Sequence, residues 1–213
     1  ATDILKQDVL LLDQPEALKS TYAMKLCLFI SGVISSSLMS EQGVKPDYVA
    51  GLSIGAWAAA TVAGVLGFED GLKLVALSGR LMQQAYPSGY GMTALMGTTQ
   101  SDVEIWVNQV YQQNQDVFIA NLNTANQIVI SGSNQAMKQV AEKAQENGVL
   151  AKRLEVSVPS HCSLLDVQAK QLAEHIKGVA QQQPNIRYLS GTSARLLMKK
   201  EQVIEDISFN MCR

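Results

Sequence analysis

The stretch Gly51-Leu52-Ser53-Ile54-Gly55 decides the fold, because a short apolar run ends at this Gly-x-Ser-x-Gly pentapeptide and a long apolar segment follows it. The pattern is typical of a nucleophile elbow, a sharp strand-to-helix turn that exposes a serine hydroxyl. We expect a Cβ atom at either glycine to collide with the neighbouring element. The same spacing also fits a tight strand-to-helix turn around a small buried serine.

The residues around the pentapeptide indicate a strand before it and a helix after it. Pro46-Asp47 breaks the regular secondary structure, and the short apolar run Tyr48-Val49-Ala50 that follows is expected to be a strand. Residues 54–66 are almost all apolar or small, which predicts a helix buried on every side. Further helices are expected at about 20–41 and 67–85.

The middle of the chain has a different pattern. Between residues 92 and 156 the order is strand, helix, strand, strand, helix, strand, which matches the ferredoxin-like βαββαβ unit. Strands are expected at residues 92–96, 117–120, 127–131 and 150–156, and helices at about 100–113 and 133–147. After it, Ser163-Leu164-Leu165-Asp166 fits a capping box that opens a helix reaching about Val179. A strand at 186–189 and a helix at about 199–209 are expected to follow.

Composition and charge narrow the classes of function. The 213 residues carry a formal net charge of -2 without basic runs, so neither nucleic acid nor a membrane is an expected partner. Cys27, Cys162 and Cys212 are widely spaced, which favours buried thiols in a reducing compartment and predicts no metal site. The longest apolar stretches are interrupted or too short to be expected to span a bilayer. We expect a soluble, cytoplasmic protein.

A nucleophilic serine needs a base, and the chain offers two histidines. His175 falls within a predicted helix, where a surface or half-buried position is expected. His161 follows an extended Val-x-Val-Pro segment before a helix, a position that would bring its ring to the end of the sheet where Ser53 lies. Alternatively, His161 is a structural residue that caps a turn. The N–H of Ile54, at the start of a helix, is placed to stabilise an oxyanion.

Four segments, taken in order, resemble malonyl-CoA:acyl carrier protein transacylases. They are Gly51-Leu52-Ser53-Ile54-Gly55, Gly79-Arg80-Leu81-Met82-Gln83, Asn121-Leu122-Asn123 with Gln127-Ile128-Val129-Ile130-Ser131-Gly132, and Val158-Pro159-Ser160-His161-Cys162. The resemblance covers nearly the whole chain. It implies an α/β fold in which an α/β-hydrolase-like core with a parallel sheet (residues 1–90 and 157–213) carries an inserted ferredoxin-like subdomain (residues 91–156).

Within this family, two stretches look most like the malonate decarboxylase epsilon subunit: Ala56-Trp57-Ala58-Ala59-Ala60 and Ala85-Tyr86-Pro87-Ser88-Gly89-Tyr90-Gly91-Met92. The resemblance then implies transfer of a malonyl group from CoA to the prosthetic group of a carrier protein. Malonyl-CoA would be a substrate, and no cofactor would be permanently bound. The expected partners are an acyl carrier protein subunit and the other malonate decarboxylase subunits.

The resemblance also implies roles for single residues. Ser53 would be the acylated nucleophile, and His161 would act first as general base and then as the acid that protonates the leaving thiolate, in a ping-pong reaction. The N–H of Ile54 would be one oxyanion donor. The main-chain carbonyl of Ile207 would orient the histidine, so an apolar side chain at that position is no objection.

The substrate-binding positions depart from the family pattern. Ser78 stands where the family has an arginine that clamps the malonyl carboxylate, and a hydroxyl cannot replace a bidentate guanidinium. Arg80, two residues further along a helix, points to roughly the opposite side and is either a substrate contact or a solvated residue. Asn121 and Asn123 lie in a matching motif and are expected to bind substrate. The transferred acyl group could therefore be malonyl or an uncharged group such as acetyl.

Other departures concern the elbow and the chain ends. Leu52 and Ala56 replace a histidine and a glutamate that transacylases usually have, which suits the decarboxylase branch. The family's Gly-Gln-Gly loop, a source of a second oxyanion donor, would precede Ala1, and the family continues past Arg213, so we expect a partial chain. Two alternatives stay open: a serine thioesterase or hydrolase, and a non-catalytic docking subunit that keeps the transferase fold.

Overall fold

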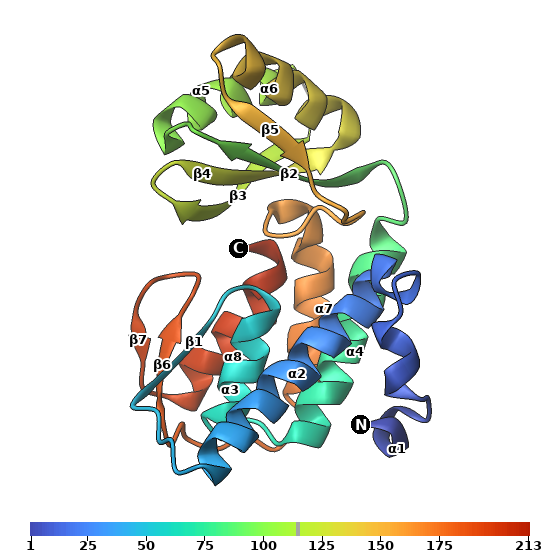
Figure 1. The fold of residues 1–213 in the computed structure, drawn as a ribbon, viewed down its shortest axis with the longest axis vertical. Coiled ribbons are helices and arrows are strands. Elements are labelled where there is room, and N and C mark those ends of the chain that lie inside the picture. The colour runs from blue at the N-terminus through green and yellow to red at the C-terminus, as the bar shows by residue number, and fades with distance from the viewer. Residues whose placement is uncertain (114–115) are drawn as a thin grey trace. The chain divides into compact units, whose positions relative to one another are not determined.

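The computed structural model describes residues 1–113 and 116–213, which form two compact units (Figure 1). Unit 1 comprises Ala1–Leu81 and Gln168–Met211, and unit 2 comprises Met82–Val167 with Cys212–Arg213. Unit 2 thus includes residues on both sides of the segment 91–156. His161 therefore belongs to unit 2.

Unit 2 contains the predicted element order βαββαβ. Its elements are β2 (Tyr90–Met96), α5 (Gln100–Tyr111), β3 (Val117–Thr124), β4 (Gln127–Ser133), α6 (Asn134–Glu146) and β5 (Leu150–Arg153). The strands form one antiparallel sheet in the order β3-β4-β2-β5. β5 ends at Arg153, three residues before its expected end.

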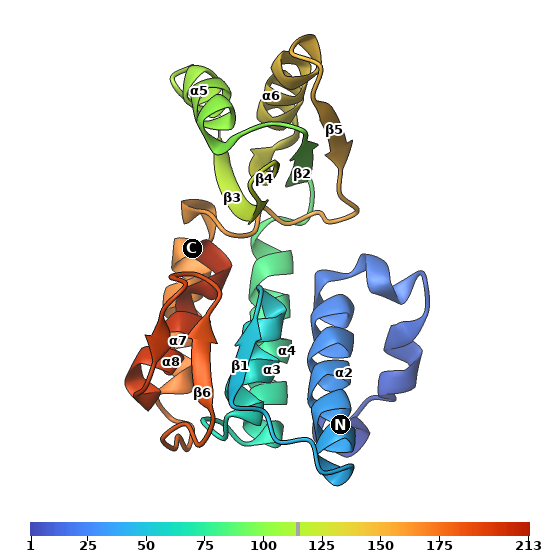
Figure 2. The same cartoon turned by 60° about the vertical axis from the view of Figure 1, so that its left-hand side comes forward.

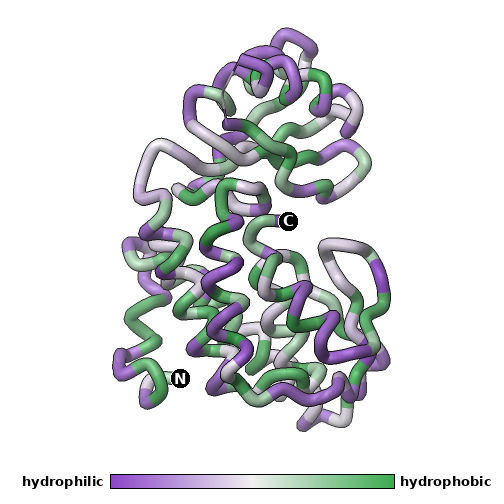
Figure 3. Tube along the Cα trace, turned by 180° about the vertical axis from the view of Figure 1, so that it is seen from behind, coloured by the Kyte–Doolittle hydropathy of each residue, from purple (hydrophilic) through white to green (hydrophobic). Residues whose placement is uncertain are grey.

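Helices α5 and α6 cover one face of this sheet (Figure 1). Ile128 and Ile130, two residues apart on β4, point to that face because side chains alternate along a strand. The helices present apolar residues to the sheet and polar ones to solvent, so α6 is largely hydrophilic in colour while β4 is hydrophobic (Figure 3). The core between them includes Leu95, Val103, Val107, Val110, Val117, Ile128, Ile130, Ala136, Met137, Val140, Ala144 and Val149.

Unit 1 contains a three-stranded sheet in the order β1-β6-β7. These strands are β1 (Tyr48–Gly51), β6 (Arg187–Ser190) and β7 (Leu196–Leu197). β1 and β6 are parallel, and β6 and β7 are antiparallel. The sequence did not predict β7, because two residues are too few for an alternating pattern to emerge.

Helices pack around this sheet. They are α1 (Thr2–Leu5), α2 (Thr21–Glu41), α3 (Ile54–Val62), α4 (Phe68–Ala85), α7 (Asp166–Ile176) and α8 (Lys200–Phe209), with short 3-10 turns at Val9–Asp13, Ala17–Lys19, Ser163–Leu165 and Asn210–Cys212. α3 contacts α2, β1, β6 and α8 and lies between β1 and α2 (Figure 2). Its residues Ala56–Ala60 are buried, with Trp57 only 1% exposed. The elbow helix is thus the centre of unit 1, although it ends four residues before residue 66.

Helix α2 corrects an expectation about membranes. It has 21 residues and contains an 18-residue stretch with a mean hydropathy of 1.5, so by length and composition it could cross a bilayer. The expectation that the longest apolar stretches are interrupted or too short to span a bilayer is therefore wrong for α2. Only 22% of that stretch is buried within the fold. Ala23, Leu26 and Phe29 are at most 2% exposed, whereas Leu28, Ile34 and Leu38 are at least 50% exposed. Phe29 stacks on Phe68, with ring centroids 5.8 Å apart.

Candidate active site

Ser53 lies between β1 and α3, where the pentapeptide predicts it. Its backbone has φ 53° and ψ -120°, a combination that residues with a Cβ rarely adopt. This strained conformation ends the strand and starts the helix within one residue, and it leaves Ser53 half-buried. As the first residue of α3, Ile54 has an N–H for which the helix offers no carbonyl. A strained strand-to-helix turn at this position is what the pentapeptide predicts, and the role of Ser53 as a nucleophile stays a prediction.

The two flanking glycines have different roles. A Cβ at Gly51 would overlap the main chain of Gly55 and Ala56, so only glycine allows the strand to lie this close to the helix. A Cβ at Gly55 would meet no atom within 4 Å. The expectation that both glycines are sterically required is therefore wrong for Gly55, whose missing Cβ points to open space.

His161 shares the backbone strain of Ser53. Its φ is 62°, and the other described residues outside glycine with positive φ are Lys6, Ser53 and Ala194. The ring is 7% exposed. Two of these four strained residues are thus the ones that the sequence singles out as nucleophile and base, and strain of this kind clusters at functional sites.

The segment that carries His161 is fixed by local hydrogen bonds. The Ser160 N–H donates to the Val158 carbonyl at 3.0 Å, and the Tyr86 hydroxyl donates to the Leu164 carbonyl at 3.0 Å. The predicted capping box is wrong: residues 163–165 form a 3-10 turn, and its N-cap, Cys162, makes no side-chain cap bond. The Leu165 N–H instead donates to the Cys162 carbonyl at 3.1 Å, which a tight turn favours.

The ring of His161 has a main-chain partner within unit 2. Its Nδ1 lies 3.0 Å from the carbonyl oxygen of Arg213. A carbonyl can only accept, so this pairing assigns the proton to Nδ1 and leaves Nε2 as the basic nitrogen. The resemblance assigned the orienting role to Ile207, which lies in α8 of unit 1, whereas the acceptor seen here is Arg213.

The thiols near this segment are poor nucleophiles. Burial raises the pKa of the Cys162 thiol, which is 5% exposed. Burial, helped by the neighbouring Asp166 carboxylate, raises the pKa of Cys212 to about 11. Both thiols are therefore protonated at neutral pH, and neither competes with a serine for an acyl group.

Ser78 and Arg80 occupy opposite sides of α4. Ser78 is fully buried, whereas Arg80 is exposed. The Arg80 guanidinium lies 5.1 Å from the centroid of the Tyr22 ring, and its Nη2 donates to the Tyr22 hydroxyl at 3.5 Å. Arg80 is thus held against the half-buried Tyr22, and its role as a substrate contact or a solvated residue stays a prediction.

The two asparagines lie on β3, an edge strand of unit 2. Asn121 is half-buried, and Asn123 is exposed and donates from Nδ2 to the Gln127 side chain at 3.3 Å. The register with β4 shifts between Ile119 and Asn121 and again after Leu122, so β3 is irregular where both residues stand. Their role as substrate ligands stays a prediction.

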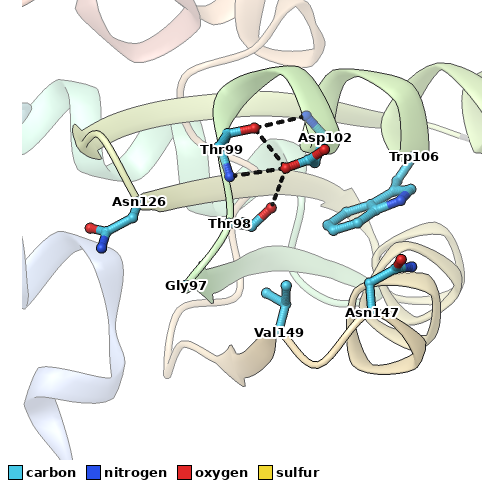
Figure 4. A pocket seen from close by; sticks show the side chains of 8 residues that line it. All are labelled: Gly97, Thr98, Thr99, Asp102, Trp106, Asn126, Asn147 and Val149. Atoms are coloured by element: carbon cyan, nitrogen blue, oxygen red, sulfur yellow. Dashed lines mark hydrogen bonds between the residues drawn. The ribbon is translucent and has the colours of Figure 1, made fainter.

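A hollow of about 350 Å³ in unit 2 is lined by none of the predicted site residues (Figure 4). The Thr99 hydroxyl accepts from the Asp102 N–H at 3.3 Å, and the Asp102 carboxylate accepts from the Thr99 N–H at 3.4 Å. These bonds form the capping box that starts α5, which accounts for the polar lining. The lining residues are Gly97, Thr98, Thr99, Asp102, Trp106, Asn126, Asn147 and Val149.

Two further expectations concern histidine and metal. His175 is an exposed residue of α7 whose Nδ1 lies 2.8 Å from the Gln171 carbonyl, as its helical position predicts. Across residues 1–113 and 116–213, no three His, Cys, Asp or Glu side chains gather as a metal ion would need.

The sequence and the fold match known proteins. Residues 2–213 match the acyl transferase domain family. The malonyl CoA-acyl carrier protein transacylase of Haemophilus influenzae is 36% identical over 206 residues, which cover 92% of this chain. This chain spans 64% of the length of that relative.

Solved structures agree with this match. FabD from Acinetobacter baumannii is 32% identical with a TM-score of 0.94, covering 100% of this chain and 69% of that chain. A malonyl-transacylase solved in complex with a type II PKS acyl-carrier protein is 29% identical with a TM-score of 0.93, covering 100% of this chain and 70% of its own. The chain belongs to the acyl transferase domain family.

Proposed function

We propose that this chain is the catalytic part of an acyltransferase that moves a malonyl group from CoA, through an acyl-serine, to the prosthetic group of a carrier protein. The strained backbone of Ser53 at the turn from β1 to α3 is the observation that carries the proposal. A turn of this kind serves nucleophilic catalysis and has no advantage in a purely structural role. The transacylase names of the relatives support the malonyl and carrier-protein assignment.

The reaction would proceed in two half-reactions. Ser53 Oγ attacks the thioester carbonyl carbon of malonyl-CoA and gives its proton to Nε2 of His161. The N–H of Ile54 stabilises the negative oxygen that develops on the carbonyl. The C–S bond then breaks, and the CoA thiolate takes the proton from His161. The product is a malonyl ester on Ser53.

The second half-reaction reverses these steps with a different thiol. His161 accepts the proton of the carrier's prosthetic-group thiol, whose sulfur attacks the malonyl ester. The C–O bond to Ser53 breaks, and the serine oxygen recovers the proton from His161. The carbonyl of Arg213 keeps Nδ1 protonated throughout, which supports its orienting role in place of Ile207.

The acyl group itself needs a separate argument. Ser78 cannot clamp a carboxylate as an arginine does, and its full burial leaves no room for an introduced arginine on that side of α4. Arg80 is engaged with Tyr22. We therefore propose malonyl as the natural group on the strength of the relatives, with acetyl accepted more readily than an arginine-bearing transacylase would accept it.

The wider setting follows from the same resemblance. We propose that the protein is a cytoplasmic subunit of malonate decarboxylase, with an acyl carrier protein subunit as its acceptor and with Asn121 and Asn123 as substrate ligands. We further propose that unit 1 is an α/β-hydrolase-like core and unit 2 an inserted ferredoxin-like subdomain, which the strand order β3-β4-β2-β5 supports.

A direct test is to incubate the intact protein with radiolabelled malonyl-CoA and to measure covalent label after denaturation. We expect label on the wild type and on Ser31→Ala, an exposed serine of α2. We expect none on Ser53→Ala and much less on His161→Ala. Label that persists on Ser53→Ala would overturn the assignment.

Two other functions give different results in the same assay. A thioesterase would release malonate without a carrier, whereas the transferase holds the label until holo-carrier is added. A non-catalytic docking subunit is favoured by Ser78 standing in place of the arginine. It predicts that a Ser53→Ala, His161→Ala double variant still supports the assembled decarboxylase.

A further inference from the structure

The turn between β6 and β7 lies beside the elbow. β6 runs parallel to β1 in a register that pairs Ser190 with Gly51, so both strands end at the same edge of the sheet. A Cβ at Gly191 would lie 2.7 Å from the Gly51 carbonyl oxygen and 3.7 Å from the Cα of Leu52. The turn therefore starts in close contact with the strand that delivers Ser53, and only glycine permits this approach.

A partly buried polar network holds the turn within unit 1. Asp206 on α8 accepts hydrogen bonds from the Ser190 hydroxyl at 2.6 Å and from the Tyr188 hydroxyl at 2.9 Å. Ser190 Oγ also accepts the N–H groups of Thr192 at 3.2 Å and Ser193 at 3.0 Å. Tyr188 is fully buried and Ser190 is 3% exposed. Hydrogen bonds to a carboxylate are stronger than those between neutral groups, so these bonds restrict the movement of the turn.

Main-chain hydrogen bonds fix where the turn ends. The Ser190 N–H donates to the Arg195 carbonyl at 2.9 Å, and the Ala194 N–H donates to the Ser190 carbonyl at 3.0 Å. Ala194 has φ 54°, the left-handed conformation that reverses the chain here. Arg195 is therefore held one strand beyond β6, and since adjacent strands lie about 5 Å apart, its backbone is roughly 10 Å from β1.

The Arg195 side chain is available to a ligand. It is exposed, and within residues 1–113 and 116–213 its guanidinium has no hydrogen bond, ion pair or ring contact. The other arginines of unit 1 are engaged: Arg80 lies over Tyr22, and Arg187 lies over Tyr48 and donates to its hydroxyl at 3.2 Å. The Tyr48–Arg187 pair marks the opposite end of the same two strands.

We propose that Arg195 binds a phosphate of the pantetheine thioester arm, the anionic group that CoA and a carrier's prosthetic group share. The inference rests on the proposed function. A guanidinium fork matches phosphate oxygens in a bidentate way, and a backbone locked in place limits the entropy lost on binding. The arm's phosphate lies at the far end from the thioester, which suits an exposed arginine about two strand spacings from the elbow strand. A clamp on the acyl carboxylate would have to lie beside Ser53 itself.

The test compares Arg195→Ala with Arg187→Ala, a matched arginine at the other end of the strands. With malonyl-CoA we expect Arg195→Ala to raise KM about tenfold with kcat little changed, because one charge-assisted contact is lost. Arg195→Lys should recover part of the loss. With malonyl-N-acetylcysteamine, a thioester without phosphate, wild type and Arg195→Ala should be equal. Arg187→Ala should match wild type with both substrates.

Two outcomes would overturn the proposal. If Arg195→Ala is equally impaired with the short thioester but unimpaired with acetyl-CoA, the arginine binds the acyl carboxylate. If malonyl-CoA kinetics are unchanged, it binds no part of the substrate. Separate measurement of Ser53 labelling and of transfer to holo-carrier shows whether CoA, the carrier arm or both use the contact.

Direct binding separates this inference from the proposed function. Isothermal titration with free CoA needs no chemistry, so it still applies if neither thioester labels Ser53. Roughly tenfold weaker CoA binding by Arg195→Ala would then support the phosphate contact while the transferase proposal fails. Equal CoA binding by both proteins, or no binding by wild type, would refute it.

Discussion

The two units differ in how completely their sheets are covered. In unit 2, strands β2 and β4 each contain five consecutive buried residues. In unit 1, β1 alternates between exposed and half-buried residues, and the neighbouring Leu52 is 58% exposed. Parallel strands are ordinarily buried on both faces. Unit 2 thus closes a core with its own residues, whereas the sheet of unit 1 is open beside the elbow.

The difference extends to connectivity and strain. Most of unit 2 is one continuous segment whose strands are joined by short loops and helices. Unit 1 pairs β1 with β6, which are far apart in the sequence, and it contains the strained Ser53. Strain persists only where the surroundings support it. We therefore expect unit 1 to be the less stable unit and the more sensitive to changes at the elbow.

The largest expected effect comes from Gly51→Ala. The added methyl group would overlap the Gly55 and Ala56 main chain, which cannot rotate away as a side chain would. We expect the free energy of unfolding of unit 1 to fall by more than about 4 kcal/mol. Hydrogen exchange resolved by peptide should show loss of protection in α3 and β1 while β2 and β4 keep theirs.

Gly55→Ala is the matched control, since its methyl group would enter open space. We expect protection of α3 to be unchanged or slightly increased, because alanine favours a helix over glycine. An equal loss of protection in both variants would show that formation of the first turn of α3, rather than the close approach of β1 to α3, limits the stability of unit 1.

A substitution in the core of unit 2 tests the expected stability of that unit. Ile130 is fully buried between the sheet and the helices of unit 2. Ile130→Ala leaves a cavity and should lower the free energy of unfolding of unit 2 by about 2 to 5 kcal/mol. Hydrogen exchange, measured during chemical denaturation, should show the loss of protection in α5, α6 and the strands of unit 2. Equal loss of protection in α2 and α3 would mean that the units unfold together.

Regular periodicity explains what the sequence could predict. Helices such as α2 and α6, and the order of elements in unit 2, followed from apolar spacing, because burial of one face imposes that spacing. The elbow followed from chemistry, since its tight turn restricts residue types at Gly51. In both cases a physical requirement acts on side chains and so leaves a trace in the sequence.

Features made by the main chain left no such trace. The Arg213 carbonyl beside His161 is a group that every residue possesses, so no composition signal distinguishes it from Ile207. The two-residue strand β7 and the 3-10 turn at Ser163–Leu165 arise from tertiary hydrogen bonds. The positive φ of His161 likewise depends on its neighbours in space.

A buried lysine gives unit 1 a pH dependence. Lys25 on α2 is 7% exposed, and burial lowers its pKa from 10.5 to about 8. The unfolded chain therefore binds more protons than the folded one between pH 8 and 10.5, so stability should rise by about 3 kcal/mol as pH rises through that window. Denaturant midpoints measured from pH 7 to 10.5 should show the rise in wild type and lose it in Lys25→Met. A rise of equal size in Lys25→Met would assign it to another group.

The smallest of these effects concerns the Asp206 network. It tests whether hydrogen bonds from α8 stabilise the turn after β6 in the open sheet of unit 1. Asp206→Asn keeps the shape but replaces one carboxylate oxygen by an amide N–H₂, which cannot accept the hydrogen bond of the hydroxyl that faces it. We expect a loss of about 2 kcal/mol, and of about 1 kcal/mol for Tyr188→Phe, which removes one of the two donors. Limited proteolysis should then detect cleavage in residues 191–195 of Asp206→Asn before any cleavage in unit 2. If that turn stays resistant, the contact of Gly191 with Gly51 is sufficient to hold it, and the support of the elbow comes from main-chain packing alone.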